Sequence, residues 1–207
     1  MEKLEKFTLA LKKFVPEGFE SHLAKLILQG QVKFRIVKGR KTKLGDFRYS
    51  SQKEIPVITV NGDLNPYAFL ITSLHEVAHL HTFNSYGISV APHGNEWKSE
   101  FRNLLLPIIN SGKLPSDIHQ ALLKSLVNTK ASSCSDVQLL RVLRNYDKSN
   151  KIDVRHLEEL KEGETFEING KRFVKGKLRR SRYLCIEVGS DKPYLIHRLA
   201  QITYAYE

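Results

Sequence analysis

Apolar residues in the first part of the chain recur at helical spacing and then at strand spacing. Positions 4–14 and 19–28 carry apolar residues about every third or fourth position, and Pro16 and Gly30 follow these two segments. The next segments, VKFRIV, LGDFRYS and IPVITVNG, alternate polar and apolar residues or carry β-branched runs. This pattern predicts two helices followed by a short sheet.

Helices are predicted again after residue 65. Asn65-Pro66 can open a helix through PYAFLITSLHEVAHLHTF, which is apolar almost all round and should lie at the centre of the core. A second helix, NEWKSEFRNLLLPII, should be kinked or ended by Pro107, and a third follows it. The fourth covers residues 135–146, with Ser135 as its N-cap.

The period changes to two from residue 163 onward. TFEINGKRFVKG predicts a hairpin with Asn169-Gly170 as a type I′ turn, and SRYLCIEV, PYLIH and ITYAY continue the alternation. We therefore expect a four-stranded antiparallel appendage after the polar linker DKSNKID. The prediction is an α+β protein with two domains, 1–150 and 151–207.

The 207 residues carry a formal net charge of +11, concentrated in two runs. Residues 33–48 hold seven Lys or Arg against one Asp, and residues 171–182 hold another seven with no acid. Either run could be an ordinary solvated face, but together they predict a nucleic-acid-binding surface, in which cations neutralise phosphates and aromatic rings stack on bases. The cations assigned to it are Lys33, Arg35, Lys38, Arg40, Lys41, Lys43, Arg179, Arg180 and Arg182. The aromatic residues are Phe34, Phe47, Tyr49, Phe173 and Tyr183.

Cysteine content and hydropathy exclude several classes of protein. Cys134 and Cys185 do not form a CxxC pair, which excludes a cysteine zinc finger and a disulfide framework, and a buried free thiol is expected for each. There is no run of eighteen apolar residues, and the N-terminus lacks the pattern of a signal peptide. We expect a cytoplasmic protein with no membrane partner, whose oligomeric state the sequence leaves open.

The stretch HEVAHLHTFNSYGISVAPHG, residues 75–94, holds four of the eight histidines. Residues four apart lie on one face of a helix, so His75 and His79 can present their imidazoles to one metal ion. Glu76 lies between them and can reach a metal-bound water without being a ligand. Burying these three polar groups in the apolar middle of a helix would be costly unless a bound ion satisfied them. The HExxH spacing therefore predicts two zinc ligands and a general base.

A catalytic zinc ion needs a third protein ligand, and two residues compete for that role. His93 lies in a loop that can return over the first helix, and Glu100 lies on the helix that follows. A compact metzincin site would need histidine where this chain has Ser85. His93 is preferred and Glu100 remains the alternative. His81 points about 200° away from His79 round the helix, so we expect no metal bond from it.

The chemistry expected of such a site is peptide-bond hydrolysis. Zinc lowers the pKa of a bound water from about 16 towards about 7, Glu76 takes the proton, and the hydroxide attacks a carbonyl that the metal polarises. Glu76 then passes the proton to the leaving amine. The sequence identifies no residue that would stabilise the oxyanion.

HEVAHLHTFN followed by APHGNEWKSEF resembles the signature of the SprT-like metalloprotease family, in which an HGxx[FW] motif supplies the third histidine. The resemblance covers residues 1–130. It implies a zincin-like fold in which His75, His79 and His93 bind one zinc ion and Glu76 is the catalytic base. The Spartan proteases of this family cleave proteins crosslinked to DNA and are activated by DNA. The resemblance therefore implies protein substrates, a DNA partner and a role in DNA–protein crosslink repair.

The C-terminal part departs from the family's pattern. Many SprT-like proteins end in a zinc ribbon held by four cysteines, whereas KGKLRRSRYLCIEV retains only Cys185. One thiolate cannot hold a structural zinc ion, so we expect one metal per chain and a degenerate tail that resembles a zinc ribbon. The apolar residues expected to stabilise this tail are Phe166, Phe173, Leu184, Ile186, Leu195 and Ile202.

Three functions are compatible with these features. The first is a zinc-dependent endopeptidase that acts on DNA-associated or DNA-crosslinked proteins. The second is a nucleic-acid-binding module with a structural zinc ion and no protease activity; Glu76, which a structural site does not need, favours the enzyme. The third is a peptidase of unfolded proteins without a DNA role, in which the charge serves solubility.

Overall fold

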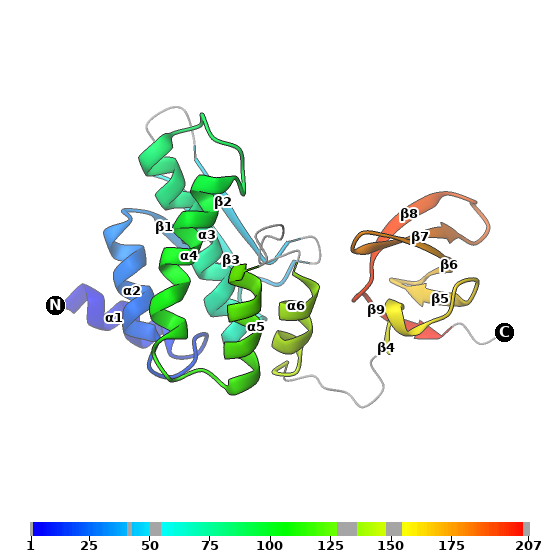
Figure 1. Ribbon diagram of the computed structural model, residues 1–207, viewed down its shortest axis with the longest axis horizontal. Coiled ribbons are helices and arrows are strands. Elements are labelled where there is room, and N and C mark those ends of the chain that lie inside the picture. Colours follow the sequence, from blue (N-terminus) through cyan, green and yellow to red (C-terminus); the bar gives the residue numbers. More distant parts are fainter. Residues whose placement is uncertain (1, 41–42, 50–54, 128–135, 148–154, 205–207) are drawn as a thin grey trace. The chain divides into compact units, whose positions relative to one another are not determined.

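The computed structural model describes residues 2–40, 43–49, 55–127, 136–147 and 155–204. The chain divides into two compact units, Met1–Lys148 and Ser149–Glu207. Among the described residues, the first unit has six α-helices and three strands, and the second has six strands (Figure 1). The fold class is therefore α+β, as predicted. None of the helices in the described ranges combines the length and apolarity that spanning a bilayer requires.

The first unit begins with two helices and a small mixed sheet. Helices α1 (Glu2–Leu11) and α2 (Glu20–Gln29) precede strands β1 (Lys33–Val37), β2 (Gly45–Arg48) and β3 (Val57–Asn61). Strand β3 lies in the middle, parallel to β1 and antiparallel to β2. Strand β2 is therefore an edge strand of this sheet.

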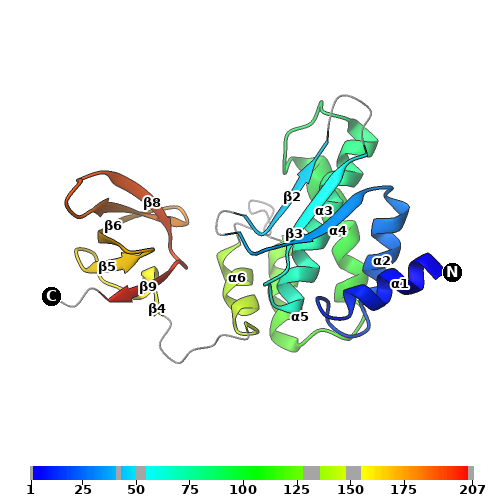
Figure 2. The same ribbon diagram turned by 180° about the vertical axis from the view of Figure 1, so that it is seen from behind.

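Helix α3 (Pro66–Tyr86) is the central element of the first unit, and thirteen of its twenty-one residues are buried, as its apolar sequence predicts. It packs against β2 and β3 on one side and against α4 (Asn95–Ile109) on the other (Figures 1 and 2). Asn65 caps it, since its Oδ1 accepts the Ala68 N–H at 2.9 Å. The Asn65 amide also donates to the Leu143 carbonyl at 2.8 Å, which ties a later helix to the start of α3.

The remaining helices are α4, α5 (Ser116–Val127) and α6 (Val137–Arg144). Helix α4 continues through Pro107 and ends two residues later, because a proline this close to the end removes a single N–H donor. The N-cap of α6 is Asp136, whose carboxylate accepts the N–H groups of Gln138 and Leu139. The predicted cap, Ser135, lies outside the described residues.

The second unit is an antiparallel sheet with the strand order β4-β9-β5-β6-β7-β8. Asn169 and Gly170 have φ values of 55° and 75° and join two strands whose register continues directly across them, which confirms the type I′ turn. The prediction of four strands is wrong. Six strands are observed within the described residues: the hairpin and the three further segments predicted to be extended form five of them, and the sixth, a two-residue strand at 155–156, is too short to show an alternating pattern. The bounds are β4 (Arg155–His156), β5 (Thr165–Ile168), β6 (Lys171–Arg179), β7 (Arg182–Glu187), β8 (Pro193–His197) and β9 (Gln201–Tyr204), with a 3₁₀ turn at Leu157–Glu159.

The core of the second unit differs in part from the predicted one. Phe166, Phe173 and Ile202 are buried as expected, but Ile186 and Leu195 are 36% and 52% exposed. On β7 the inward position belongs to Cys185, and successive side chains of a strand point to opposite faces. Leu184 and Ile186 therefore lie on the outer face. The residues that complete the core are Leu157, Leu160 and Cys185.

Candidate metal centre

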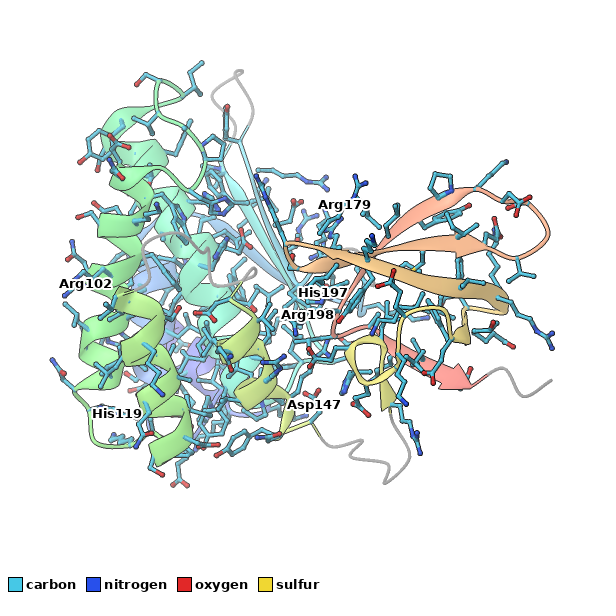
Figure 3. All side chains as sticks on the ribbon, turned by 45° about the vertical axis from the view of Figure 1, so that its right-hand side comes forward. Arg102, His119, Asp147, Arg179, His197 and Arg198 are labelled. Carbon is cyan, nitrogen blue, oxygen red and sulfur yellow. The ribbon has the colours of Figure 1, made fainter. Side chains whose placement is uncertain are left out.

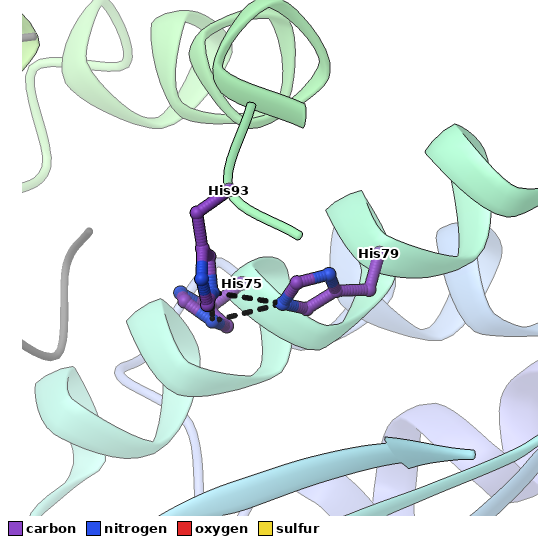
Figure 4. A group of neighbouring side chains, drawn as sticks. All are labelled: His75, His79 and His93. Carbon is purple, nitrogen blue, oxygen red and sulfur yellow. Dashed lines mark hydrogen bonds between the residues drawn. The ribbon is translucent and has the colours of Figure 1, made fainter. Parts of the chain in front are cut away.

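Three histidine side chains converge at α3 (Figure 4). His75 and His79 lie one turn apart on that helix, and His93 reaches them from the loop that leads into α4. The Nε2 atoms are 3.2 Å apart for His75 and His79, 3.0 Å for His79 and His93, and 3.1 Å for His75 and His93. The three nitrogens thus form a nearly regular triangle.

This triangle fits one small cation. Its sides allow an ion to lie about 2.0–2.1 Å from all three nitrogens, which is the usual distance between zinc and a histidine nitrogen. When each imidazole carries its proton on Nδ1, three lone pairs point at the same place, and a cation there would satisfy all of them. Within the described residues, His75, His79 and His93 form the one group of three side chains whose ligand atoms lie close enough together to hold a metal ion.

The surroundings keep the imidazoles neutral. Burial, followed by the proximity of His79 and His93, lowers the pKa of His75 to about 2. Burial, followed by the proximity of His93, lowers the pKa of His79 to about 4, and burial also lowers the pKa of His93. Neutral imidazole is the form that binds a metal ion, so no proton has to be removed from this site at neutral pH.

His93 has a backbone conformation that a histidine rarely adopts. Its φ of 59° lies in the left-handed region, which costs a residue other than glycine roughly 1–2 kcal/mol. Such conformations persist where the surrounding structure enforces them, and they gather at ligand-binding sites. The loop therefore holds His93 in a strained backbone conformation, and in this conformation the His93 ring meets the two helix histidines.

Glu76 lies beside the histidines, and strand β2 holds it in place. The side chain is on α3, is only 5% exposed, and accepts a hydrogen bond from the backbone N–H of Phe47 on β2. Burial, followed by the nearby Asp46 carboxylate, raises the pKa of Glu76 to about 8, although Arg40 acts in the opposite direction. A cation bound by the histidines would likewise lower the pKa of this carboxyl group.

The structure places His93, and not Glu100, beside the two helix histidines. The Glu100 carboxylate instead lies 3.4 Å from Nδ1 of His81, and both side chains are partly exposed. His81 thus pairs with a residue of α4 and is not one of the three convergent histidines, as its position on the helix predicts. The contact between Glu76 and strand β2 could not be predicted from the sequence, because nothing in the LGDFR segment indicates which residue of the helix this strand will contact.

The cations predicted to bind DNA in the first unit have different environments. Lys33, Arg35 and Lys38 are exposed. Arg40 donates to the Asn61 side chain at 2.8 Å and lowers the pKa of Glu76, so it faces the candidate site. Lys43 forms an ion pair with Asp46 at 2.9 Å, and Lys41 lies outside the described residues.

The predicted cations of the second unit lie together on the β6–β7 hairpin. Arg179 and Arg182 are directly opposite each other in the two strands, Arg180 is in the turn, and all three are exposed. Figure 3 labels Arg179 at this end of the sheet together with His197, which pairs with Arg182 across β7 and β8. The three side chains Arg179, Arg182 and His197 therefore form a row across three strands.

The aromatic residues assigned to the same surface differ in exposure, and the prediction is wrong for Phe173, which is buried. Phe173 is 4% exposed, and Phe34 packs against Phe7 and Phe69 in the core. The Phe47 ring lies parallel to that of His79, with 6.3 Å between their centroids. Tyr49 is 48% exposed.

Comparison with known proteins agrees with the geometry of the site. The model of the SprT-like family matches residues 4–109, which is just over half of the chain. No curated protein and no solved structure gives a significant match. The matched region contains α3, the three convergent histidines and Glu76. The chain belongs to the SprT-like family.

Proposed function

We propose that this protein is a zinc-dependent endopeptidase. The observation that carries the proposal is the convergence of His75, His79 and His93 beside a buried carboxylate, Glu76, which a main-chain N–H orients. A purely structural metal site would not need a glutamate in this position. Membership of the SprT-like family supports the same conclusion.

In this proposal each residue of the site has one role. A zinc ion held by the Nε2 atoms of the three histidines would supply a Lewis acid that activates water and polarises the scissile carbonyl. The Glu76 carboxylate accepts a proton from the attacking water and donates it to the leaving amine. The Phe47 N–H donates to this carboxylate and keeps it in one orientation. The proton taken from water and the proton given to the amine therefore pass through a carboxylate that does not rotate between the two steps.

We also propose that its substrates are proteins bound or crosslinked to DNA. The net charge of +11 favours a polyanionic partner. The pairing of Arg179 with Arg182 points to the hairpin as part of the DNA surface, since like charges directly opposite each other in a sheet destabilise it. No ion pair within the described residues neutralises either side chain. A bound phosphate would relieve this repulsion.

One assay separates this proposal from its alternatives. Purified protein is incubated with a DNA-binding protein as substrate, without DNA and with single- or double-stranded DNA, beside the variant Glu76→Gln. Cleavage that requires both DNA and Glu76 supports the proposal. Cleavage that ignores DNA indicates a peptidase of free proteins. Salt-sensitive DNA binding without cleavage in any condition indicates a nucleic-acid-binding module.

A further inference from the structure

A single indole contacts all three histidines of the metal centre. Trp97, on α4, is 1% exposed. The centroid of its ring lies 4.6 Å from that of His75, 5.3 Å from that of His79 and 4.7 Å from that of His93. The imidazoles come from a helix and from a loop (Figure 4), and the indole touches both segments.

Other aromatic side chains around the site contact one histidine each. The ring of Phe101 lies 5.8 Å from that of His75, and the ring of Phe47 lies 6.3 Å from that of His79. Phe101 also stacks on Trp97 with 4.9 Å between centroids, so the indole is itself fixed from behind. Among these three side chains, Trp97 alone couples the position of His93 to that of the helix histidines.

Packing, rather than hydrogen bonding, determines where this indole lies. Its Nε1 atom is buried and has no hydrogen-bond partner within the described part of the chain. A buried indole N–H usually finds an acceptor. Here the indole keeps its contacts with the three imidazoles although its N–H group makes no hydrogen bond in this orientation. Replacement by phenylalanine therefore removes ring area and no hydrogen bond.

We propose that Trp97 is a positioning residue, whose ring holds the three imidazoles with their Nε2 atoms directed at one metal ion. The inference rests on the proposed metal centre but not on proteolysis. Because His93 sits in a strained loop, its ring needs a contact that prevents it from moving away when no metal is bound. Trp97 provides that contact and so prepares the site for the ion.

The test compares Trp97→Leu and Trp97→Phe with Phe69→Leu. Phe69 is a fully buried aromatic residue of the same core, packs against Phe14 and Phe34, and has no ring contact with the three histidines, so it controls for lost stability. Zinc affinity is measured by competition with a chelator, folding by circular dichroism, and ligand geometry by the visible spectrum of the Co²⁺-loaded protein. None of these readouts needs protease activity.

We expect Trp97→Leu to weaken zinc binding about 10- to 100-fold, as loss of a residue that orients metal ligands usually does. Its Co²⁺ spectrum should change as well, whereas Phe69→Leu should keep the wild-type affinity and spectrum. Trp97→Phe should fall between these limits. If Trp97→Leu fails to fold, the test rests on Trp97→Phe. Zinc binding by Trp97→Phe that is at least about threefold weaker than zinc binding by Phe69→Leu then supports the role of Trp97. Equal affinities and spectra in the folded variants overturn it.

Trp97 also gives a direct signal, because it is the chain's single tryptophan. One equivalent of Co²⁺, which quenches nearby fluorophores, should strongly reduce the emission of the folded protein. The same addition to His93→Ala should leave most of it. Emission of the wild-type protein that one equivalent of Co²⁺ leaves unchanged would show that the ion does not bind next to the indole, and would contradict the inference even if the wild-type protein cleaves its substrates.

Discussion

The α-carbon of Gly45 lies directly against the side chain of Glu76. A β-carbon at position 45 would be 2.5 Å from Oε1 and 2.8 Å from Cγ of that glutamate, and 2.8 Å from the methyl group of Thr72. The backbone of Gly45 does not have a positive φ, so its conformation does not require glycine. What requires glycine is the space that the carboxylate occupies between α3 and the edge strand β2.

Gly45→Ala should therefore impair catalysis without removing the metal site. The new methyl group must displace the Glu76 side chain or push β2 away from it, and a displacement of about 1 Å at a reacting group can cost about 100-fold in rate. Cleavage rate and zinc content are the measurements. Zinc content should stay at the wild-type level, because the three atoms nearest to the new methyl group belong to Glu76 and Thr72 and not to a histidine. Full activity in this variant would show that the glutamate does not depend on the strand.

His93→Ala and Glu100→Ala should have opposite effects on the metal. Removing the His93 imidazole leaves two corners of the triangle, so bound zinc should fall from one equivalent per chain to a small fraction. Removing Glu100 breaks only its partly exposed pair with His81, which is worth about 0–1 kcal/mol, and zinc should remain bound. Metal analysis after dialysis gives the answer. Retention of zinc in His93→Ala and its loss in Glu100→Ala would reverse our assignment.

Local patterns of the sequence were sufficient to predict the helices and the first two corners of the metal site. His75 and His79 meet because they are one turn apart on one helix, and that geometry is independent of the rest of the fold. His93 was harder to predict, because the path of a loop depends on contacts made elsewhere. It was preferred over Glu100 because its loop can return over the helix, and the resemblance to the family's motif pointed to the same residue. The role of β2 was not predictable, since the contacts of Gly45 and Phe47 with Glu76 arise from tertiary packing.

The second unit illustrates the limits of an alternating pattern. On β7, Leu184 and Ile186 are the most apolar side chains, and apolarity alone assigns them to the core. The sheet instead buries Cys185 and leaves Ile186 partly exposed. Because a strand must choose one of two phases, an error of one residue exchanges every inward and outward position. Leu157 and Leu160 fill the space from the 3₁₀ turn, which carries no periodic signal.

The arginines of the β6–β7 hairpin should contribute to DNA affinity and to its salt dependence. Changing Arg179, Arg180 and Arg182 to Ala removes up to three phosphate contacts, each worth about 0.9 in the slope of log K against log salt for duplex DNA. Fluorescence anisotropy at several salt concentrations measures that slope. The control variant replaces Lys3, Lys12 and Lys13, exposed residues in and just after α1, and removes the same charge. An unchanged slope in the arginine variant, or an equal change in the control, would place the DNA surface elsewhere.

Glu187 should titrate well below an ordinary glutamate. The Lys171 ammonium, 2.6 Å from its carboxylate, and the hydroxyl groups of Ser190 and Tyr194 lower the pKa of Glu187 to about 2. These bonds favour the charged form, so their stabilising effect is complete above the ordinary value of 4.5 and disappears as the pH falls towards 2. NMR titration of the side-chain carboxyl group reports the pKa, and Lys171→Met should raise it. A wild-type midpoint near 4.5 would mean that the pair does not form in solution.

The central claim is that Glu76 and a zinc ion on the three histidines hydrolyse a peptide bond. The most direct measurement is cleavage of a protein substrate in ¹⁸O-labelled water under single-turnover conditions, followed by mass spectrometry of the fragments. Wild-type protein and Glu76→Gln are compared at equal, verified zinc content. Our account predicts that the wild-type protein yields fragments whose new carboxyl group carries one solvent oxygen, and that Glu76→Gln yields none above background. Equal hydrolysis by the two proteins, or none by the zinc-loaded wild-type protein in the presence of DNA, would contradict it.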